Sequence, residues 1–148
     1  IMYTKARLVD DAGDEKEILT FGPVCVEPEL QRRGYGKQLM EHSFTQALEL
    51  GYGAIVIFRS PSNYVARGFQ SCRKFQVSVE GGKYPAAMLV KELVPGSLAG
   101  KHWTYYDSPV MSISEEDAAR YDDTLPPMER QHQPSQEEFY IMSHSFVE

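Results

Sequence analysis

The sequence predicts an α+β domain built on a mixed, mostly antiparallel sheet, and two patterns carry that prediction. Polar turn residues at 10–14 separate two largely apolar segments, 1–9 and 17–26, as in an antiparallel hairpin. Apolar residues then recur at helical spacing from 36 to 50, and the run 54–58 follows as a short apolar strand. A strand, a helix and a second strand in this order predict a right-handed crossover between parallel strands.

The remaining elements follow from local signals. Pro23 interrupts the second hairpin arm and predicts a bulge or local splaying there, because proline cannot donate a ladder hydrogen bond. A short helix is expected over 60–67, where Ser-Pro-Ser-Asn opens it and a glycine ends it. Strands are expected at 75–79 and 87–93, on either side of a Gly-Gly turn.

Size and composition fit one compact domain of 148 residues, of which 42% are hydrophobic and 24% charged. The longest apolar runs are far shorter than the roughly 20 residues that cross a bilayer, and no charged-then-apolar leader opens the chain. We therefore expect a cytoplasmic protein without a membrane partner. Cys25 and Cys72 have neither Cys-x-x-Cys spacing nor companion histidines, so we expect no metal and no disulfide framework.

Most of the net charge of -6 lies in the C-terminal part of the chain. Residues 1–106 carry 13 basic and 11 acidic side chains, whereas residues 107–148 carry 2 basic and 10 acidic ones. This asymmetry argues against a nucleic-acid partner for the tail. We divide the chain into a core, 1–100, and an acidic, aromatic extension, 101–148, that packs on the same domain or on a partner subunit. The signatures Ser114-x-x-Asp117 and Ser135-x-x-Glu138 predict short helices in that extension.

The most informative stretch is the glycine-spaced turn between the second hairpin arm and the long helix. Gly34 and Gly36 let the backbone approach a ligand closely or adopt positive φ. The helix that follows presents unpaired N–H groups and the positive end of its dipole. Three basic side chains add positive charge: Arg32, Arg33 and Lys37. This combination suits a phosphate group.

The wider string resembles the acetyl-coenzyme A signature of the GNAT superfamily of N-acetyltransferases, whose core is Gln/Arg-x-x-Gly-x-Gly/Ala. Here that core is Gln31-Arg32-Arg33-Gly34-Tyr35-Gly36, preceded by Val-x-Val-x-Pro. A Walker loop would need Gly-x-x-x-x-Gly-Lys-Ser/Thr, and a dinucleotide-binding turn would need a glycine at Leu39, so neither fits. The segments 84–88 and 95–100 resemble a bacterial branch of predicted acetyltransferases, which extends the resemblance over about 1–100.

The resemblance implies a three-layer α/β/α fold with a central, splayed pair of parallel strands. It also implies acetyl-CoA as the co-substrate, with backbone amides of about 32–37 on the pyrophosphate and the backbone of residues 24 to 26 paired with the pantetheine arm. Asn63 is expected either to bond a pantetheine amide or to cap the short helix. The cofactor-binding residues so implied are Val24, Cys25, Val26, Gln31, Arg32, Arg33, Gly34, Tyr35, Gly36, Lys37 and Asn63.

The family's first strand and two helices have no counterpart here, so the resemblance implies an N-terminally truncated domain. The acceptor side would then be completed by the chain's own tail or by a second copy, as in a homodimer. A long bare strand edge would otherwise invite aggregation.

Acetyl transfer to an amine needs a proton acceptor, because a lysine-like amine with a pKa of about 10.4 is almost fully protonated at pH 7. The departing thiolate benefits from a proton donor. In the family a tyrosine four residues before a Gly-Phe pair points at the sulfur, and Tyr64 has that spacing to Gly68-Phe69. It is implied as the general acid, the alternative being a packing residue. Glu27 is the candidate base, the alternative being an exposed loop residue or a partner of the helix dipole.

We therefore expect an acetyltransferase that moves an acetyl group directly from acetyl-CoA to a primary amine of a small-molecule or peptide acceptor. The alternative is a noncatalytic CoA-binding or interaction module derived from the same domain. The sequence does not name the acceptor amine.

Overall fold

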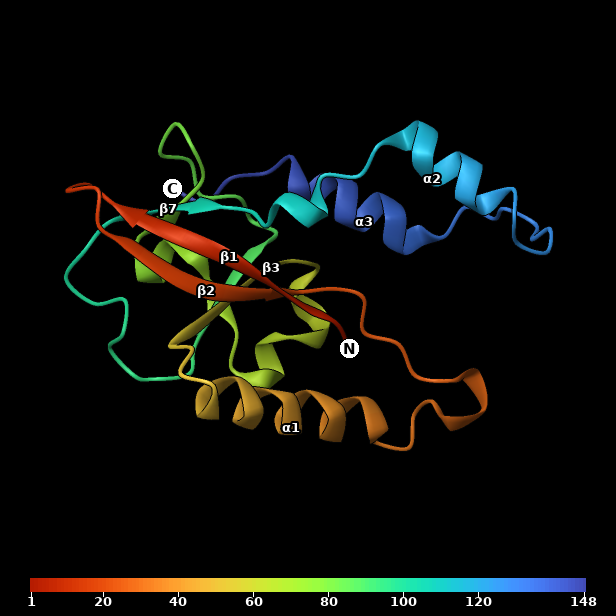
Figure 1. The fold of residues 1–148 in the computed structure, drawn as a ribbon, viewed down its shortest axis with the longest axis horizontal. Coiled ribbons are helices and arrows are strands. Elements are labelled where there is room, and N and C mark those ends of the chain that lie inside the picture. Colours follow the sequence, from red (N-terminus) through yellow and green to blue (C-terminus); the bar gives the residue numbers. More distant parts are fainter.

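The computed structural model describes residues 1–148, and its central feature is a seven-stranded mixed sheet in the order β4-β6-β3-β2-β1-β7-β5 (Figure 1). Four of its six strand pairs are antiparallel, which confirms the α+β class. The strands are β1 (Tyr3–Asp10), β2 (Glu15–Phe21), β3 (Ala54–Phe58), β4 (Gln70–Ser71), β5 (Val77–Ser78), β6 (Met88–Glu92) and β7 (Trp103–Tyr106). The helices are α1 (Tyr35–Glu49), α2 (Glu115–Asp122) and α3 (Pro134–Ser143). No helix is both long and apolar enough to cross a membrane.

The hairpin of β1 and β2 leads into a parallel pair that parts early. The hairpin register runs from Tyr3↔Phe21 to Val9↔Glu15. Strand β2 then meets β3 in parallel at one pair only, Leu19↔Ile55. The predicted splayed pair at the centre of the sheet is therefore confirmed.

The second hairpin arm is shorter than the pattern predicts. It ends at Phe21 instead of residue 26, just before Gly22-Pro23. Because Pro23 has no N–H to donate, it cannot continue the ladder. Residues 22–27 consequently lie outside the sheet.

Helix α1 covers one face of the sheet, as its apolar spacing predicts. It begins after Gly34, whose φ of 85° is left-handed. Its buried side chains Met40, Phe44 and Ala47 pack in one cluster with residues of β2 and β3. Burial of this stripe fixes α1 against the two splayed strands (Figure 1).

The sheet curls around a second core on its other face. Its two edge strands, β4 and β5, are separated in sequence only by the short 3₁₀ turn η4 (Cys72–Phe75) and Gln76. This link draws the edges toward each other. The enclosed cluster takes side chains from β1, β2, β3, β5, β6 and β7: Ala6, Leu8, Ile18, Ala54, Val56, Val77, Met88, Val90, Trp103 and Tyr105, with Cys72 and Leu98 from the connections.

The tail supplies a strand of the sheet and two peripheral helices. Strand β7 pairs antiparallel with β1, so the chain itself covers the edge of the hairpin. Sequence analysis left two ways of covering this edge open, the chain's own tail and a second copy of the chain. Helices α2 and α3 lie on the side of the sheet away from α1 (Figure 1). The C-terminus is attached through the bonds Val147 N–H to Tyr84 O, 2.8 Å, and Ala86 N–H to Ser145 O, 2.8 Å.

Two expected segments have a different local structure. The span 60–67 forms two 3₁₀ turns, η2 (Pro61–Asn63) and η3 (Val65–Arg67), instead of one short helix. In the span 75–79 only β5 is a strand, and it pairs in parallel with β7. That pairing is tertiary, so the local sequence could not indicate it.

The tail helices differ in how they begin. Ser114 caps α2 as expected, and its hydroxyl accepts the Asp117 N–H at 3.3 Å. Helix α3 begins one residue before Ser135, at Pro134, and its capping box is formed by Gln133 and Gln136. Proline is favourable at the first helical position, which moves the cap back to residue 133.

Candidate functional site

Residues 24 to 26 form a segment with free backbone groups beside the parting strands. Burial alternates along it, with Val24 and Val26 half-buried and Cys25 exposed, as in an extended chain. The N–H groups of all three residues, and the carbonyls of the first two, bond to no other backbone group. The Val26 carbonyl accepts the Gln31 side-chain amide at 2.9 Å. We call residues 24 to 26 the free segment. It can accept an extended, amide-bearing ligand as an added strand.

The same segment leads directly to the start of α1. The first bond of the helix runs from Gln38 N–H to Gly34 O at 3.0 Å, so the three N–H groups of residues 35 to 37 have no helical partner. No atom lies within 4 Å of the position that a Cβ on Gly34 would take. Arg32 and Arg33 are exposed beside it. The arrangement is an open, positively polarised helix start that can hold an anion.

Tyr64 lies between η2 and η3, next to the end of β2. Its ring packs on Phe21 with centroids 6.0 Å apart and edge-on to Phe69 at 5.9 Å. Gly68, with φ of 86°, turns the chain so that Phe69 is fully buried. The Tyr64 hydroxyl makes no hydrogen bond with the chain, so the ring is fixed while the proton donor stays free.

The other two polar candidates are less constrained. Asn63 is exposed and its side chain makes no hydrogen bond, and the residue that begins η2 is Ser60. Glu27 is exposed at the start of the 3₁₀ turn η1 (Pro28–Leu30), and only its backbone carbonyl is engaged, by Leu30 N–H at 2.9 Å. The structure therefore places Glu27 near the free segment without fixing its carboxylate.

Sequence analysis missed a group of polar side chains near the end of β2. Arg59 follows β3, and its guanidinium lies where a side chain on Gly22 would stand. Tyr105 and Asp107 reach the same region from the tail, joined by a hydrogen bond of 2.8 Å. No local pattern marks these residues, because only the curl of the sheet brings them together.

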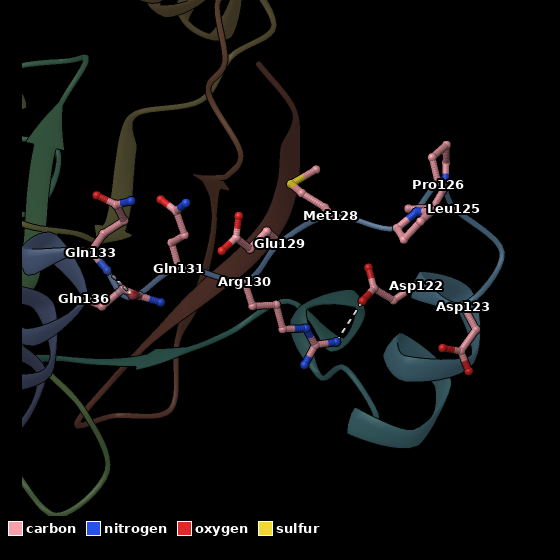
Figure 2. A pocket seen from close by; sticks show the side chains of 11 residues that line it. Asp122, Asp123, Leu125, Pro126, Met128, Glu129, Arg130, Gln131, Gln133 and Gln136 are labelled. Carbon is pink, nitrogen blue, oxygen red and sulfur yellow. Dashed lines mark hydrogen bonds and ion pairs between the residues drawn. The ribbon is translucent and has the colours of Figure 1, made fainter.

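The largest hollow lies elsewhere. It measures about 840 Å³ and is lined only by tail residues between 122 and 136, where Arg130 bonds Asp122 at 2.9 Å (Figure 2). A smaller, mostly apolar hollow of about 400 Å³ lies between α1 and the hairpin. Neither contains a residue of the free segment or of the turn before α1. No group of three or more His, Cys, Asp or Glu side chains in the chain is placed to hold a metal ion.

Comparison with known proteins agrees with this arrangement. Residues 3–72 match the model of the acetyltransferase (GNAT) family, and this range contains the parting strands, the turn before α1 and Tyr64. No curated protein matches the chain. A solved structure of a GNAT family N-acetyltransferase (YhbS) from Escherichia coli in complex with CoA aligns with a TM-score of 0.58 and 20% identity.

That alignment covers 70% of this chain and 58% of the E. coli chain. The chain thus spans little more than half of the solved protein, and at this identity the likeness concerns the fold. The fold expected from the glycine-spaced turn is confirmed by it. Over residues 3–72 this chain is similar to the acetyltransferase (GNAT) family.

Proposed function

We propose that the chain transfers an acetyl group from acetyl-CoA directly to a primary amine. The observation that carries this proposal is the segment from Gly22 to Val26, which runs from the gap between β2 and β3 to the open start of α1. Acetyl-CoA would supply an acetyl thioester on an amide-bearing arm that ends in a pyrophosphate. The free groups of the chain match the arm and the pyrophosphate in kind and in order.

In this proposal the backbone does most of the binding. The N–H and C=O groups of residues 24 to 26 pair with the amides of the arm, as one strand pairs with another. The N–H groups of residues 35 to 37 hold the pyrophosphate, and exposed Arg32 and Arg33 add positive charge. Gln31 serves the site indirectly, because its side chain ties the turn to Val26.

Tyr64 is proposed as the proton donor to the leaving sulfur. During transfer the amine nitrogen forms a bond to the acetyl carbon, the carbon–sulfur bond breaks, and Tyr64 protonates the thiolate. The amine proton passes to a base or to water, and Glu27 is the candidate base nearest to the free segment in sequence. Burial raises the pKa of Cys72 to about 11, so this thiol stays protonated and is not suited to carry the acetyl group.

One observation favours a noncatalytic alternative. The Glu27 carboxylate is exposed and has no hydrogen-bond partner, so no oriented base faces the gap from this segment. A domain that binds CoA without transferring the acetyl group would need no such base. This alternative predicts cofactor binding without turnover.

Release of free CoA thiol from acetyl-CoA, measured with and without a panel of amines, tests the proposal. We expect thiol release that depends on the amine and an acetylated product of matching mass. Calorimetry of CoA binding, run in parallel, separates the alternatives. Binding without turnover on any amine would favour the noncatalytic module, and absence of both would contradict both functions.

A further inference from the structure

Six residues lie around the end of β2. Along β2 the side chain of Phe21 packs on the α1 side, so its neighbours Thr20 and Gly22 face the enclosed side. Side chains from β3 and from the tail reach this spot. We call the group the strand-end cluster: Thr20, Gly22, Phe58, Arg59, Tyr105 and Asp107.

The cluster contains a cation without a carboxylate partner. The Arg59 guanidinium lies in the gap between the parting strands, at the place where a Cβ on Gly22 would stand. Its Nη1 donates to the Phe58 carbonyl at 3.0 Å, and no Asp or Glu oxygen lies within 4 Å of it. The residue is half-buried. A guanidinium with donors left over is suited to bind a carboxylate.

The cluster also contains an anion that is held in place. Asp107 Oδ1 accepts the Tyr105 hydroxyl at 2.8 Å and the Ser108 N–H at 2.8 Å, which leaves Oδ2 free. Burial raises the pKa of Tyr105, and the neighbouring Asp107 raises it further, so the phenol stays a donor. Asp107 is exposed. Its carboxylate can therefore meet a ligand from solution.

The two charges lie on either side of an aromatic pair and do not neutralise each other. The rings of Phe58 and Tyr105 pack with centroids 5.5 Å apart. Arg59 borders this pair through the Phe58 carbonyl, and Asp107 borders it through the Tyr105 hydroxyl.

This separation bears on the choice of acceptor. A guanidinium beside the gap disfavours an amine that carries only positive charge, because like charges repel in a half-buried setting. An amine that also carries a carboxylate can pair with both charges, with its ammonium at Asp107 and its carboxylate at Arg59.

We propose that the acceptor is an amine that also bears a carboxylate, of the amino-acid class, and that Arg59 and Asp107 are its two anchors. The transfer step rests on the function proposed above, whereas the binding of the acceptor does not.

Matched acceptors test the specificity. Each pair consists of an amino acid and its carboxamide, for example leucine with leucinamide and 4-aminobutyrate with 4-aminobutanamide. We expect wild type to show kcat/KM at least tenfold higher for the acid of each pair. Arg59→Met should lower this value for the acids by about 10-fold to 100-fold and change it little for the amides. Arg73→Met, which removes a cation that stacks on Tyr84, is the matched control and should change neither.

A binding measurement keeps the inference separate from turnover. Calorimetry of the same pairs on CoA-loaded protein should show an acid preference that Arg59→Met abolishes and Arg59→Lys partly keeps. Asp107→Asn should weaken both members of a pair, because both carry the ammonium. Preferential binding without turnover would refute the transfer function and leave the acceptor site standing. Turnover or binding without preference for the acid, or an equal loss on both members in Arg59→Met with an unchanged melting temperature, would overturn this inference.

Discussion

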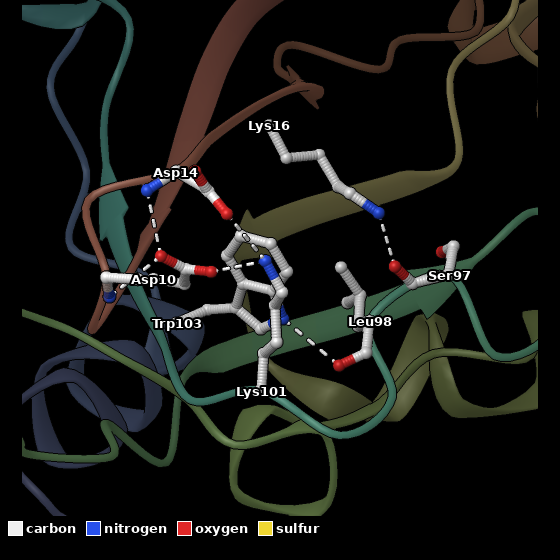
Figure 3. A network of polar contacts seen from close by, with 8 residues as sticks. Asp10, Asp14, Lys16, Ser97, Leu98, Lys101 and Trp103 are labelled. Atoms are coloured by element: carbon white, nitrogen blue, oxygen red, sulfur yellow. Dashed lines mark hydrogen bonds and ion pairs between the residues drawn. The ribbon is translucent and has the colours of Figure 1, made fainter.

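Polar groups lack partners at one end of the hairpin and are bonded to one another at the other end. At the end where β2 parts from β3, the N–H groups of residues 24 to 26, the first N–H groups of α1 and the Tyr64 hydroxyl have no partner in the chain. At the other end, around the turn between β1 and β2, neighbouring polar groups are bonded to one another (Figure 3). The first arrangement keeps bonding capacity for a ligand, and the second holds the fold together.

The bonded end is organised around Asp10 and Trp103. Asp10 Oδ1 accepts the N–H groups of Ala12 at 3.0 Å and Asp14 at 2.8 Å, while Lys101 bonds its other oxygen and, at 3.1 Å, Asp14 (Figure 3). The Trp103 indole donates to the Leu98 carbonyl at 3.0 Å. Lys101 also lies over the Trp103 ring, 5.3 Å from its centroid. These contacts tie the loop before β7 to the hairpin turn.

The comparison teaches where a ligand can bind, because the parting strands leave polar groups unpaired whereas those of the hairpin turn are paired within the chain. A buried or half-buried group without a partner costs free energy in the unliganded protein. At the parting strands several such groups lie in one row, in the order that one extended ligand would meet them. Substitutions at this end should therefore change function, and substitutions at the other end should change stability.

The largest effect is expected at Tyr64. Tyr64→Phe keeps the ring that packs on Phe21 and Phe69 and removes the free hydroxyl. If that hydroxyl protonates the thiolate, turnover at saturating acetyl-CoA should fall by about 100-fold to 10,000-fold, with CoA affinity nearly unchanged. Tyr52→Phe is the control, because it removes a phenol that bonds Glu17 at 3.3 Å. Rates within about threefold of wild type would remove Tyr64 from the mechanism.

A paired glycine substitution compares the two ends directly. Gly34, before α1, and Gly13, in the hairpin turn, have φ of 85° and 89°, and no atom lies within 4 Å of a Cβ at either position. Valine should strain both sites similarly. Only Gly34→Val should weaken CoA binding, by about tenfold or more, as measured by calorimetry. Equal CoA affinity in Gly34→Val and Gly13→Val would show that the phosphate site is wrongly placed.

Removing the lysine at the bonded end should affect stability alone. Lys101→Met abolishes the bonds to Asp10 and Asp14, of which Asp10 is buried. We expect the melting temperature to fall by about 2–4 °C, with CoA affinity unchanged. Lys5→Met breaks an exposed pair with Glu17 and should have a smaller effect. A larger loss from Lys5→Met, or a change in CoA affinity with Lys101→Met, would contradict the division between the two ends.

The smallest effect is a pH dependence that originates at the same end. The hydrogen bond from Lys101 lowers the pKa of Asp10, burial partly opposes it, and the Asp14 and Ala12 N–H groups lower it further. A carboxyl with a lowered folded-state pKa stabilises the protein above its unfolded value of about 3.9, and this contribution is lost as pH falls through the folded-state pKa. Asp10→Asn should therefore melt below wild type at neutral pH, with the gap closing below about pH 4. A gap that stays constant from pH 7 to pH 3 would exclude this origin.

Local patterns predicted the elements whose signals are local. The apolar period and Gly51 indicated α1, the polar turn at 10–14 indicated the hairpin, and Ser114 indicated the start of α2. The glycine-spaced turn indicated the family. Three errors, at 22–26, at 60–67 and at the start of α3, fall where proline changes the local backbone. The error at 75–79 reflects the pairing of β5 with β7.

Sequence analysis predicted the part of the candidate site that is proposed to bind the cofactor, but not the part around Arg59 and Asp107. The free segment, the turn before α1 and Tyr64 lie in residues 24 to 64, and each has a sequence signature. Arg59 and Asp107 have none, and they come together because η4 joins the two edges of the sheet and β7 pairs with β1. Their partners are distant in sequence, which periodicity and motif spacing do not encode.

The sequence by itself determined the open start of α1, because a glycine-spaced turn at a helix start is a local feature. It also determined the apolar faces that form the two cores. Only the tertiary structure decided that the tail covers the hairpin edge and that Arg59 and Tyr105 come to lie near the end of β2. These outcomes depend on pairing between segments far apart in the chain, where burial of whole faces selects the register and a single residue carries little signal.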